Sequence, residues 1–403
     1  MHPPQVSPIP QRLHYLDALR GLALLGIFLS IINGFNFSPV FFESFNKTHP
    51  DLWSRIWGSM NELIISQRFI AIFSLLFGVG ISIQRANFLS KNAHFAVFYI
   101  RRMLLLALLG LINTTFFFWG EILLTYAIFG LLLAPFFKAN FRVLVTSSIL
   151  IYVLVHPIWV MHFGEGVAEY LMAPLLDSYQ AEDLFRIYRD GSFREMMVLR
   201  WHEYVALFSG NDEYLRTSFC LILLGYGLGK YNYLHRFIHT IDDHHKWLVL
   251  SGVIAGILSL FTLSTGLYSL SLRISPPVAI ALSIWRLAST YFYIHLFLLL
   301  YHRTRLRRVL DVFGYVGRMS LSNYMLGAFL YALIFHNMGL GLYAKLPMWT
   351  EFPIALGVYM ICLTFSWRWQ TLYLIGPLEW VWRSFSYWKK QPMLKEPTFY
   401  TQR

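Results

Sequence analysis

The sequence contains little charge and almost no cysteine. Charged residues make up 13% of the 403 residues, and the two cysteines, Cys220 and Cys362, both lie in apolar stretches. An ordinary soluble domain carries about 25% charged residues, so this composition excludes a typical soluble enzyme. Two cysteines in apolar surroundings provide neither a disulfide framework nor a metal site of known spacing. We therefore expect no bound metal.

The sequence also lacks the motifs of soluble nucleotide-binding and hydrolytic enzymes. It has no P-loop, no nucleophile elbow and no Ser-His-Asp order. The sequence is instead rich in hydrophobic residues, which make up 57% of it. A membrane-spanning helix needs about 20 predominantly apolar residues. This composition predicts an all-α, polytopic integral membrane protein, with residues 1–403 forming a single transmembrane domain.

Apolar runs bounded by charges or by Gly and Pro predict about ten transmembrane helices. Five fall within residues 1–162, an outer loop occupies 163–210, and five more, with a cytoplasmic tail, occupy 211–403. Within the outer loop, apolar residues recur at helical spacing from Leu184 to Trp201, which predicts one interfacial helix. The predicted spans lie near 13–34, 62–84, 99–118, 120–137, 143–162, 211–229, 247–267, 278–301, 315–336 and 350–371.

The charges in the loops orient these spans. Of the 33 Lys and Arg residues, 19 fall on one face and 8 on the other. Because cytoplasmic loops carry the excess of positive charge, both termini are expected in the cytoplasm. The net charge of +12 then reflects topology, and no nucleic-acid partner is expected.

Six arginines remain inside the predicted spans or at their edges. A charge at this depth costs several kcal/mol unless it is paired or faces water. Three of the six lie close enough to helix ends for their side chains to reach the interface, whereas Arg286 lies about 12 Å inside its helix. The predicted substrate-binding residues are four of these arginines, Arg20, Arg68, Arg286 and Arg318, together with Asn323. The other two are Arg216 and Arg368.

Two of these arginines enter from the cytoplasmic face. Asp17 and Arg20 are three residues apart and share one face of the first span. They form either an intrahelical ion pair or an arginine site for a phosphate or carboxylate, which the guanidinium fork suits. Arg318 and Asn323 enter the ninth span from the same side. This placement favours a shared anionic site.

Candidates for general acid or base catalysis are few. Glu121 lies at the outer turn between the third and fourth spans, and His295 lies nine residues after Arg286 on the same side of the eighth span. A hydrogen-bonded packing role is the alternative for His295. Near the end of the chain, Glu379 and Arg383 are four residues apart, and we expect them to form an ion pair within an interfacial anchor.

Several stretches resemble the YeiB family of polytopic bacterial membrane proteins. The matching stretches are Leu16–Ile27, Arg68–Gly80, the paired Arg101-Arg102, Gly120–Tyr126, Gly317–Tyr324 and Gly376–Arg383. The resemblance implies a multi-pass protein of the bacterial inner (cytoplasmic) membrane. That family is similar, more distantly, to the transmembrane acyltransferases, which pass an acyl group from cytoplasmic acyl-CoA to an acceptor on the far side.

This second likeness implies roles for particular residues. Arg20 and Arg318 would hold the phosphates of the donor, and Glu121 or an outer histidine would deprotonate the acceptor. Acyl-CoA would be a co-substrate, and no resident cofactor is expected. YeiB-family members usually carry a histidine before their Gly-Asp-Ile-Leu signature, where this chain has Asn113, and Glu121 replaces the signature Asp. Because an asparagine cannot act as a base, Asn113 is expected to orient its neighbours.

The function expected from the sequence is a membrane acyltransferase that acts on an envelope lipid, a glycan or a small exported metabolite. A transporter or lipid flippase without covalent chemistry is the alternative, and a structural or immunity-type protein is the third hypothesis. The expected partners are the lipid bilayer, a small-molecule or lipid substrate and a second copy of the chain in a homodimer.

Overall fold

The computed structural model describes residues 14–90, 95–163, 178–209, 212–233, 237, 240, 245–265 and 276–395. The regular elements that these residues form are helices, and a single bridge joins Tyr373 to Leu394, so the predicted all-α class is confirmed. The helices used below are α1 (His14–Asn36), α2 (Phe42–Thr48), α3 (Leu52–Met60), α4 (Arg68–Leu89), α5 (Phe95–Phe116), α6 (Leu123–Leu133), α7 (Phe141–Phe163), α9 (Ala181–Asp190), α10 (Phe193–Ser209), α11 (Asp212–Lys230), α13 (His245–Thr265), α14 (Pro276–Arg303), α15 (Arg307–Arg318), α16 (Ser320–Phe335), α17 (Glu351–Leu372) and α18 (Pro377–Tyr387).

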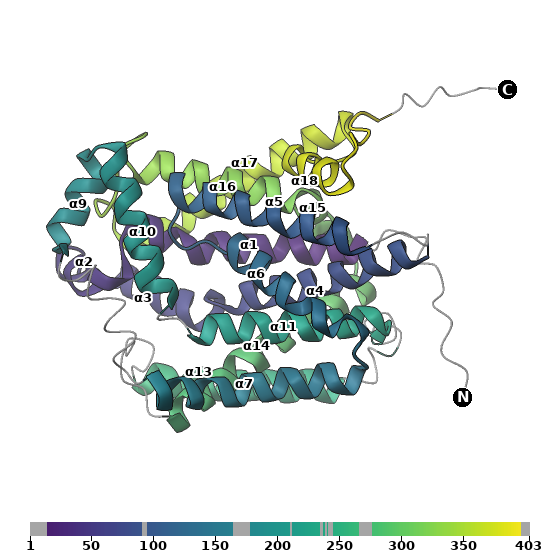
Figure 1. Cartoon of the computed structure of the whole chain (residues 1–403). Coiled ribbons are helices and arrows are strands. Elements are labelled where there is room, and N and C mark those ends of the chain that lie inside the picture. Colours follow the sequence, from purple (N-terminus) through teal and green to yellow (C-terminus); the bar gives the residue numbers. More distant parts are fainter. Residues whose placement is uncertain are drawn as a thin grey trace.

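The long helices run side by side along one direction (Figure 1). Helices α2, α3, α9 and α10 gather at one end of this bundle, which we call the α10 end, and α18 lies toward the other, the α18 end. In the part of the chain that the structure describes, six helical stretches are long and apolar enough to cross a membrane. The chain is therefore a multi-pass membrane protein. The six stretches are His14–Asn36, Leu52–Leu89, Phe95–Phe116, His245–Thr262, Ala281–Arg303 and Met348–Leu372.

Helix α1 is the centre of the bundle. It packs against α4, α15, α16 and α17, and most of its residues are buried. Its contact with α15 brings the two backbones together: a Cβ atom at Gly317 would lie 1.8 Å from the Asp17 carbonyl oxygen, and one at Gly21 would lie 1.9 Å from the Phe313 carbonyl oxygen. Only glycine fits at these two positions, which is how small residues let membrane helices approach closely.

Two predicted elements are each divided in the structure. The predicted ninth span, 315–336, is wrong as a single helix because α15 ends at Arg318 and α16 starts at Ser320. The predicted interfacial helix from Leu184 to Trp201 is likewise two helices, α9 and α10. The break between α9 and α10 at Gly191 is stabilised by Asn337, whose side-chain amide donates to the Gly191 carbonyl oxygen.

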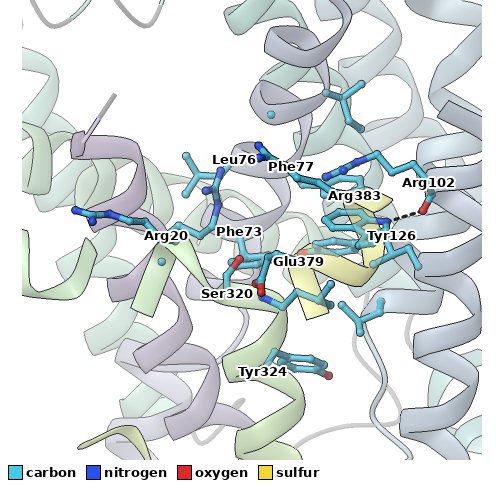
Figure 2. A pocket seen from close by; sticks show the side chains of 18 of the residues that line it. Arg20, Phe73, Leu76, Phe77, Arg102, Tyr126, Ser320, Tyr324, Glu379 and Arg383 are labelled. Carbon is cyan, nitrogen blue, oxygen red and sulfur yellow. Dashed lines mark hydrogen bonds between the residues drawn. The ribbon is translucent and has the colours of Figure 1, made fainter. Parts of the chain in front are cut away.

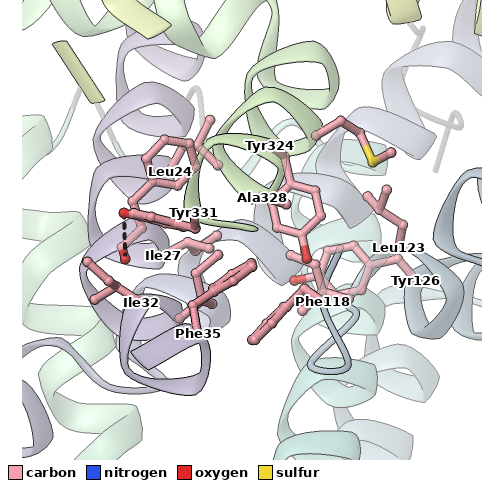
Figure 3. Close-up of a cluster of buried hydrophobic side chains, with 14 of the residues drawn as sticks. Leu24, Ile27, Ile32, Phe35, Phe118, Leu123, Tyr126, Tyr324, Ala328 and Tyr331 are labelled. Atoms are coloured by element: carbon pink, nitrogen blue, oxygen red, sulfur yellow. Dashed lines mark hydrogen bonds between the residues drawn. The ribbon is translucent and has the colours of Figure 1, made fainter. Parts of the chain in front are cut away.

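An aromatic layer lies between α1, the α5–α6 turn and α16 (Figure 3). Phe35 of α1 stacks on Phe118 of the α5–α6 turn, with ring centres 4.2 Å apart, and lies 5.2 Å from the ring of Tyr331 of α16. The Tyr331 hydroxyl donates to the Phe28 carbonyl oxygen over 3.2 Å. These rings are buried and packed together in the core of the bundle.

Candidate functional site

A cavity of about 430 Å³ lies inside the α18 end of the bundle (Figure 2). Helices α1, α4, α5, α6, α15, α16 and α18 contribute to its wall. Six charged side chains line it, four of them arginines, and we call it the arginine cavity. The six are Asp17, Arg20, Arg102, Arg318, Glu379 and Arg383.

Asp17 joins the two arginines that the sequence places on one face. Arg20 Nη1 lies 3.4 Å from one carboxylate oxygen of Asp17, and Arg318 Nε lies 3.8 Å from the other. Arg318 also donates through Nη1 to Gln370 Oε1 over 3.1 Å. The predicted Asp17–Arg20 pair is therefore present, and Arg20 and Arg318 line the same cavity.

Glu379 fixes the wall of the cavity at the start of α16. Its carboxylate accepts hydrogen bonds from the backbone amides of Leu321 (2.8 Å) and Ser322 (3.1 Å) and from the Ser322 hydroxyl (2.5 Å). An acidic side chain at a helix N-terminus satisfies amides that lack partners within the helix. Glu379 thus caps α16, which differs from the expected pair with Arg383, although both residues line the cavity.

Arg102 is a cavity residue that the sequence reasoning missed. Its guanidinium carbon lies 3.3 Å from the ring centre of Trp382, and the Trp382 indole donates to the Arg102 carbonyl oxygen over 2.7 Å. These contacts attach α18 to α5. In Figure 2, Arg102 and Arg383 lie on the opposite side of the cavity from Arg20, with Glu379 between them. The available signal was the paired Arg101-Arg102 of the family resemblance.

Another part of the cavity wall is apolar and aromatic. Phe73, Phe77 and Leu106 line it, followed by Tyr126 and Tyr324. The Tyr126 hydroxyl lies 2.7 Å from the Ser74 hydroxyl, so its polar atom is satisfied inside the wall. The arginine cavity therefore has a cationic part and an apolar part.

Glu121 lies directly behind this apolar wall. Ile122 and Leu123, the next two residues, line the cavity, and Glu121 itself is 1% exposed. Its carboxylate accepts hydrogen bonds from the Leu123 backbone amide and from the side-chain amide of Asn113. The structure thus brings Asn113 and Glu121 into direct contact, and the amide holds the carboxylate beside the cavity.

The remaining predicted residues lie outside the arginine cavity. Arg68 is fully buried, so it does not reach the interface as a helix-end arginine would: its Nη1 donates to the carbonyl oxygens of Glu62 (2.5 Å) and Ser66 (2.7 Å), and its guanidinium lies 4.0 Å from the Trp285 ring centre. Arg286 Nη2 lies 3.5 Å from the Glu62 carboxylate. Arg68 and Arg286 therefore belong to one polar region around Glu62.

Asn323 and His295 also lie apart from the cavity. Asn323 donates to the Val316 carbonyl oxygen (3.1 Å) and to the Ser366 hydroxyl (2.7 Å), so it ties α16 to α15 and α17. His295 is fully buried in α14, with edge contacts to the rings of Phe237 and Tyr291. Its surroundings match the packing role that the sequence left open.

A second buried polar group, the α10 cluster, lies at the opposite end of the bundle. It comprises Tyr188, Arg200, Glu203 and His336, and the Tyr188 hydroxyl donates to the Glu203 carboxylate. Arg200 Nη2 lies 2.9 Å from Nδ1 of His336, and because a guanidinium only donates, this nitrogen must accept. The sequence offered no signal for this burial, because Arg200 reads as an ordinary loop charge.

Burial perturbs the acid–base behaviour of this cluster. It raises the pKa of Glu203 to about 7, although hydrogen bonds from Tyr188 and Ser38 and the charge of Arg200 act in the other direction. It lowers the pKa of His336 well below its ordinary value, and the charge of Arg200 adds to this effect. His336 is therefore neutral at physiological pH.

Comparison with known proteins agrees with the resemblance noted in the sequence. The family model "Protein of unknown function (DUF418)" matches residues 228–389. The chain is 29% identical to the uncharacterised protein YxaH of Bacillus subtilis, covering 96% of this chain and 97% of that protein. It is 25% identical to the uncharacterised protein YeiB of Escherichia coli, covering 92% and 95%. The chain is thus similar to YeiB and YxaH over nearly its whole length.

A third relative extends this family likeness. An uncharacterised 39.9 kDa protein in the amylase 3′ region of Bacillus acidopullulyticus is 29% identical and covers 96% of this chain and 97% of its own length. These three relatives match along nearly their whole length. No solved structure matches the chain significantly.

Proposed function

We propose that the chain is an acyltransferase of the bacterial cytoplasmic membrane, which moves an acyl group from cytoplasmic acyl-CoA to an envelope lipid, a glycan or a small metabolite. One observation carries the proposal: the arginine cavity runs from four arginines to an apolar wall that adjoins Glu121. The positive-inside pattern of the loops supports a cytoplasmic location of the α18 end, where acyl-CoA is available.

The cationic part of the cavity suits the phosphates of such a donor. Four arginines face two acids, Asp17 and Glu379, so the lining has an excess of two positive charges. Arginine binds phosphate oxygens in a bidentate manner, which makes it the preferred residue for this task. Glu379 already caps α16 and Asp17 holds Arg20 and Arg318 in place, so both acids organise the site.

The distance from the arginines to Glu121 fits a CoA thioester. Arg102 and Asn113 are eleven residues apart on α5, which corresponds to about 16 Å along a helix. This is about the length of an extended pantetheine arm. A donor with its phosphates at Arg102 and Arg383 would therefore bring its thioester to the apolar wall in front of Glu121.

The transfer step then follows from the position of Glu121. The hydroxyl or amine of the acceptor attacks the thioester carbonyl carbon while the Glu121 carboxylate takes its proton. The carbon–sulfur bond breaks, the acyl group stays on the acceptor, and CoA leaves as its thiolate. Asn113 orients the carboxylate.

Binding and turnover of acetyl-CoA test this proposal in nanodiscs. Arg383→Gln should weaken acetyl-CoA binding about tenfold or more, which is the value of a charge-assisted hydrogen bond. Arg383 is preferred to Arg20 and Arg318 because those two also hold Asp17. Glu121→Gln should keep binding and lose about 10²-fold to 10⁴-fold in acyl transfer or slow hydrolysis. Arg368→Gln, at an exposed position outside the cavity, is the control.

Two results would overturn the proposal. The first is a wild-type protein that neither binds nor hydrolyses acetyl-CoA. The second is movement of an unmodified substrate across sealed liposomes without any dependence on the donor, because a transporter or flippase needs no acyl-CoA.

A further inference from the structure

A second pocket of about 400 Å³ lies at the same end of the bundle, between the first residue of α1 and helix α15. Its charged lining is Arg307, Arg308, Arg318 and one acid, Asp311, with His14 at its edge. Arg318 lines this pocket and the arginine cavity as well, so the two spaces meet at one guanidinium. We call the second space the α15 pocket.

The positive charge of the α15 pocket is accessible to an anion. Asp311 accepts a hydrogen bond from the Tyr301 hydroxyl over 2.5 Å and lies 3.9 Å from Arg307 Nε. The Arg307 and Asp311 side chains are 61% and 46% exposed, and an exposed pair of this kind contributes little. Arg307 can therefore exchange this contact for a phosphate, and Arg308 adds a second guanidinium beside it.

The pocket also offers an aromatic ring. Tyr315 lines it half-buried, and the Arg318 guanidinium carbon lies 5.4 Å from the centre of the Tyr315 ring. Aromatic and guanidinium planes are surfaces on which flat heterocycles stack. The pocket therefore has the features of a nucleotide-binding site: a ring for the base, two arginines for a phosphate and a third arginine that leads to the arginine cavity.

We propose that the α15 pocket binds the nucleoside 3′-phosphate of the CoA donor. The adenine stacks on Tyr315, the 3′-phosphate binds Arg307 and Arg308, and the donor passes Arg318 into the arginine cavity, where its pyrophosphate binds Arg102 and Arg383. This inference rests on the proposed acyl-CoA function, and it adds that the protein distinguishes CoA from donors that lack the 3′-phosphate.

Equilibrium binding of acetyl-CoA and acetyl-dephospho-CoA, which differ only in the 3′-phosphate, tests the inference. The intact protein in nanodiscs should bind acetyl-CoA at least about tenfold more tightly. The double variant Arg307→Gln/Arg308→Gln should weaken acetyl-CoA binding to the level of acetyl-dephospho-CoA and leave the latter unchanged. The double variant Lys389→Gln/Lys390→Gln removes two exposed charges near α18 that do not line the pocket, and it should keep the preference.

The outcomes separate this inference from the function on which it rests. Equal binding of both ligands by the wild-type protein overturns the α15 pocket and leaves the acyl-CoA proposal intact. A loss that is equal for both ligands in the Arg307/Arg308 variant overturns it too, because the effect then comes from long-range charge. If the wild-type protein binds neither ligand, the proposed function itself fails.

Discussion

The close contact between α1 and α15 makes Gly317→Ala a direct test of the packing that forms the site. The added Cβ atom would lie 1.8 Å from the Asp17 carbonyl oxygen and 2.8 Å from the Gly21 backbone nitrogen. Carbon and oxygen atoms that are not bonded approach to about 3.3 Å or more, so the two backbones must separate by about 1.5 Å. Asp17 and Arg318 lie directly beside the contact, and their ion pair would be pulled apart with it.

The magnitude follows from two opposing contributions. Overpacking of a well-packed contact costs about 1–3 kcal/mol. Replacing a helical glycine by alanine returns up to about 1 kcal/mol of helix propensity. Gly314→Ala supplies the matched control on the same helix, because its Cβ would have only the Ala18 nitrogen nearby, at 3.9 Å. Since both variants gain the same propensity, the difference between them, about 1–3 kcal/mol, isolates the clash.

Thermal unfolding in detergent, followed by tryptophan fluorescence, measures this difference. We expect Gly317→Ala to unfold at a lower temperature than the wild type and Gly314→Ala at the same or a higher temperature. Acetyl-CoA binding should weaken in Gly317→Ala because Arg318 is displaced. If Gly317→Ala is as stable as Gly314→Ala, the backbones of α1 and α15 do not touch and the geometry of the arginine cavity is wrong.

Two further predictions concern the other polar regions. In the α10 cluster, the raised pKa of Glu203 gives a stabilisation that is complete below its ordinary pKa of 4.5 and lost as the pH rises to about 7, whereas the lowered pKa of His336 gives one that is present above 6.5 and lost as the pH falls. Glu203→Gln keeps only the contribution of His336, so its unfolding temperature should fall toward acidic pH. His336→Gln keeps only the contribution of Glu203, so its unfolding temperature should fall as the pH rises toward neutral. Identical pH profiles of the two variants would contradict these assignments. Arg68→Lys should cost about 1–3 kcal/mol in unfolding free energy, because a lysine cannot donate to both carbonyl groups and stack on Trp285, while the exposed Arg368→Lys should change it by less than about 0.5 kcal/mol; equal effects would refute the buried position of Arg68.

The long helices could be predicted because apolar length is a local property. The spans expected at 13–34, 99–118 and 350–371 correspond within a few residues to α1, α5 and α17. The break between α15 and α16 could not be predicted in this way, because the carboxylate that caps α16 belongs to Glu379, 58 residues after Leu321. Contacts of such long range are invisible to a hydropathy pattern.

The site was predictable in part for the same reason. The spacing of Asp17 and Arg20 within one helix is local, and their ion pair is present in the structure. Which side of α5 faces the cavity cannot be inferred from nearby residues, because it depends on the contact of Arg102 with Trp382, 280 residues later. The burial of Arg200 is not local either, because it depends on His336, 136 residues later.

The central position of α1 has a consequence for biosynthesis. Its hydrogen bond to α16 joins Phe28 to Tyr331, which are 303 residues apart, so the first helix enters the membrane long before its partners are made. At 5–20 residues per second, the delay is roughly 15–60 s. During that time Asp17 and Arg20 of the nascent chain have each other but lack Arg318. A ribosome that stalls before α15 would leave Gly21 and the Asp17–Arg20 pair without the helix that covers them.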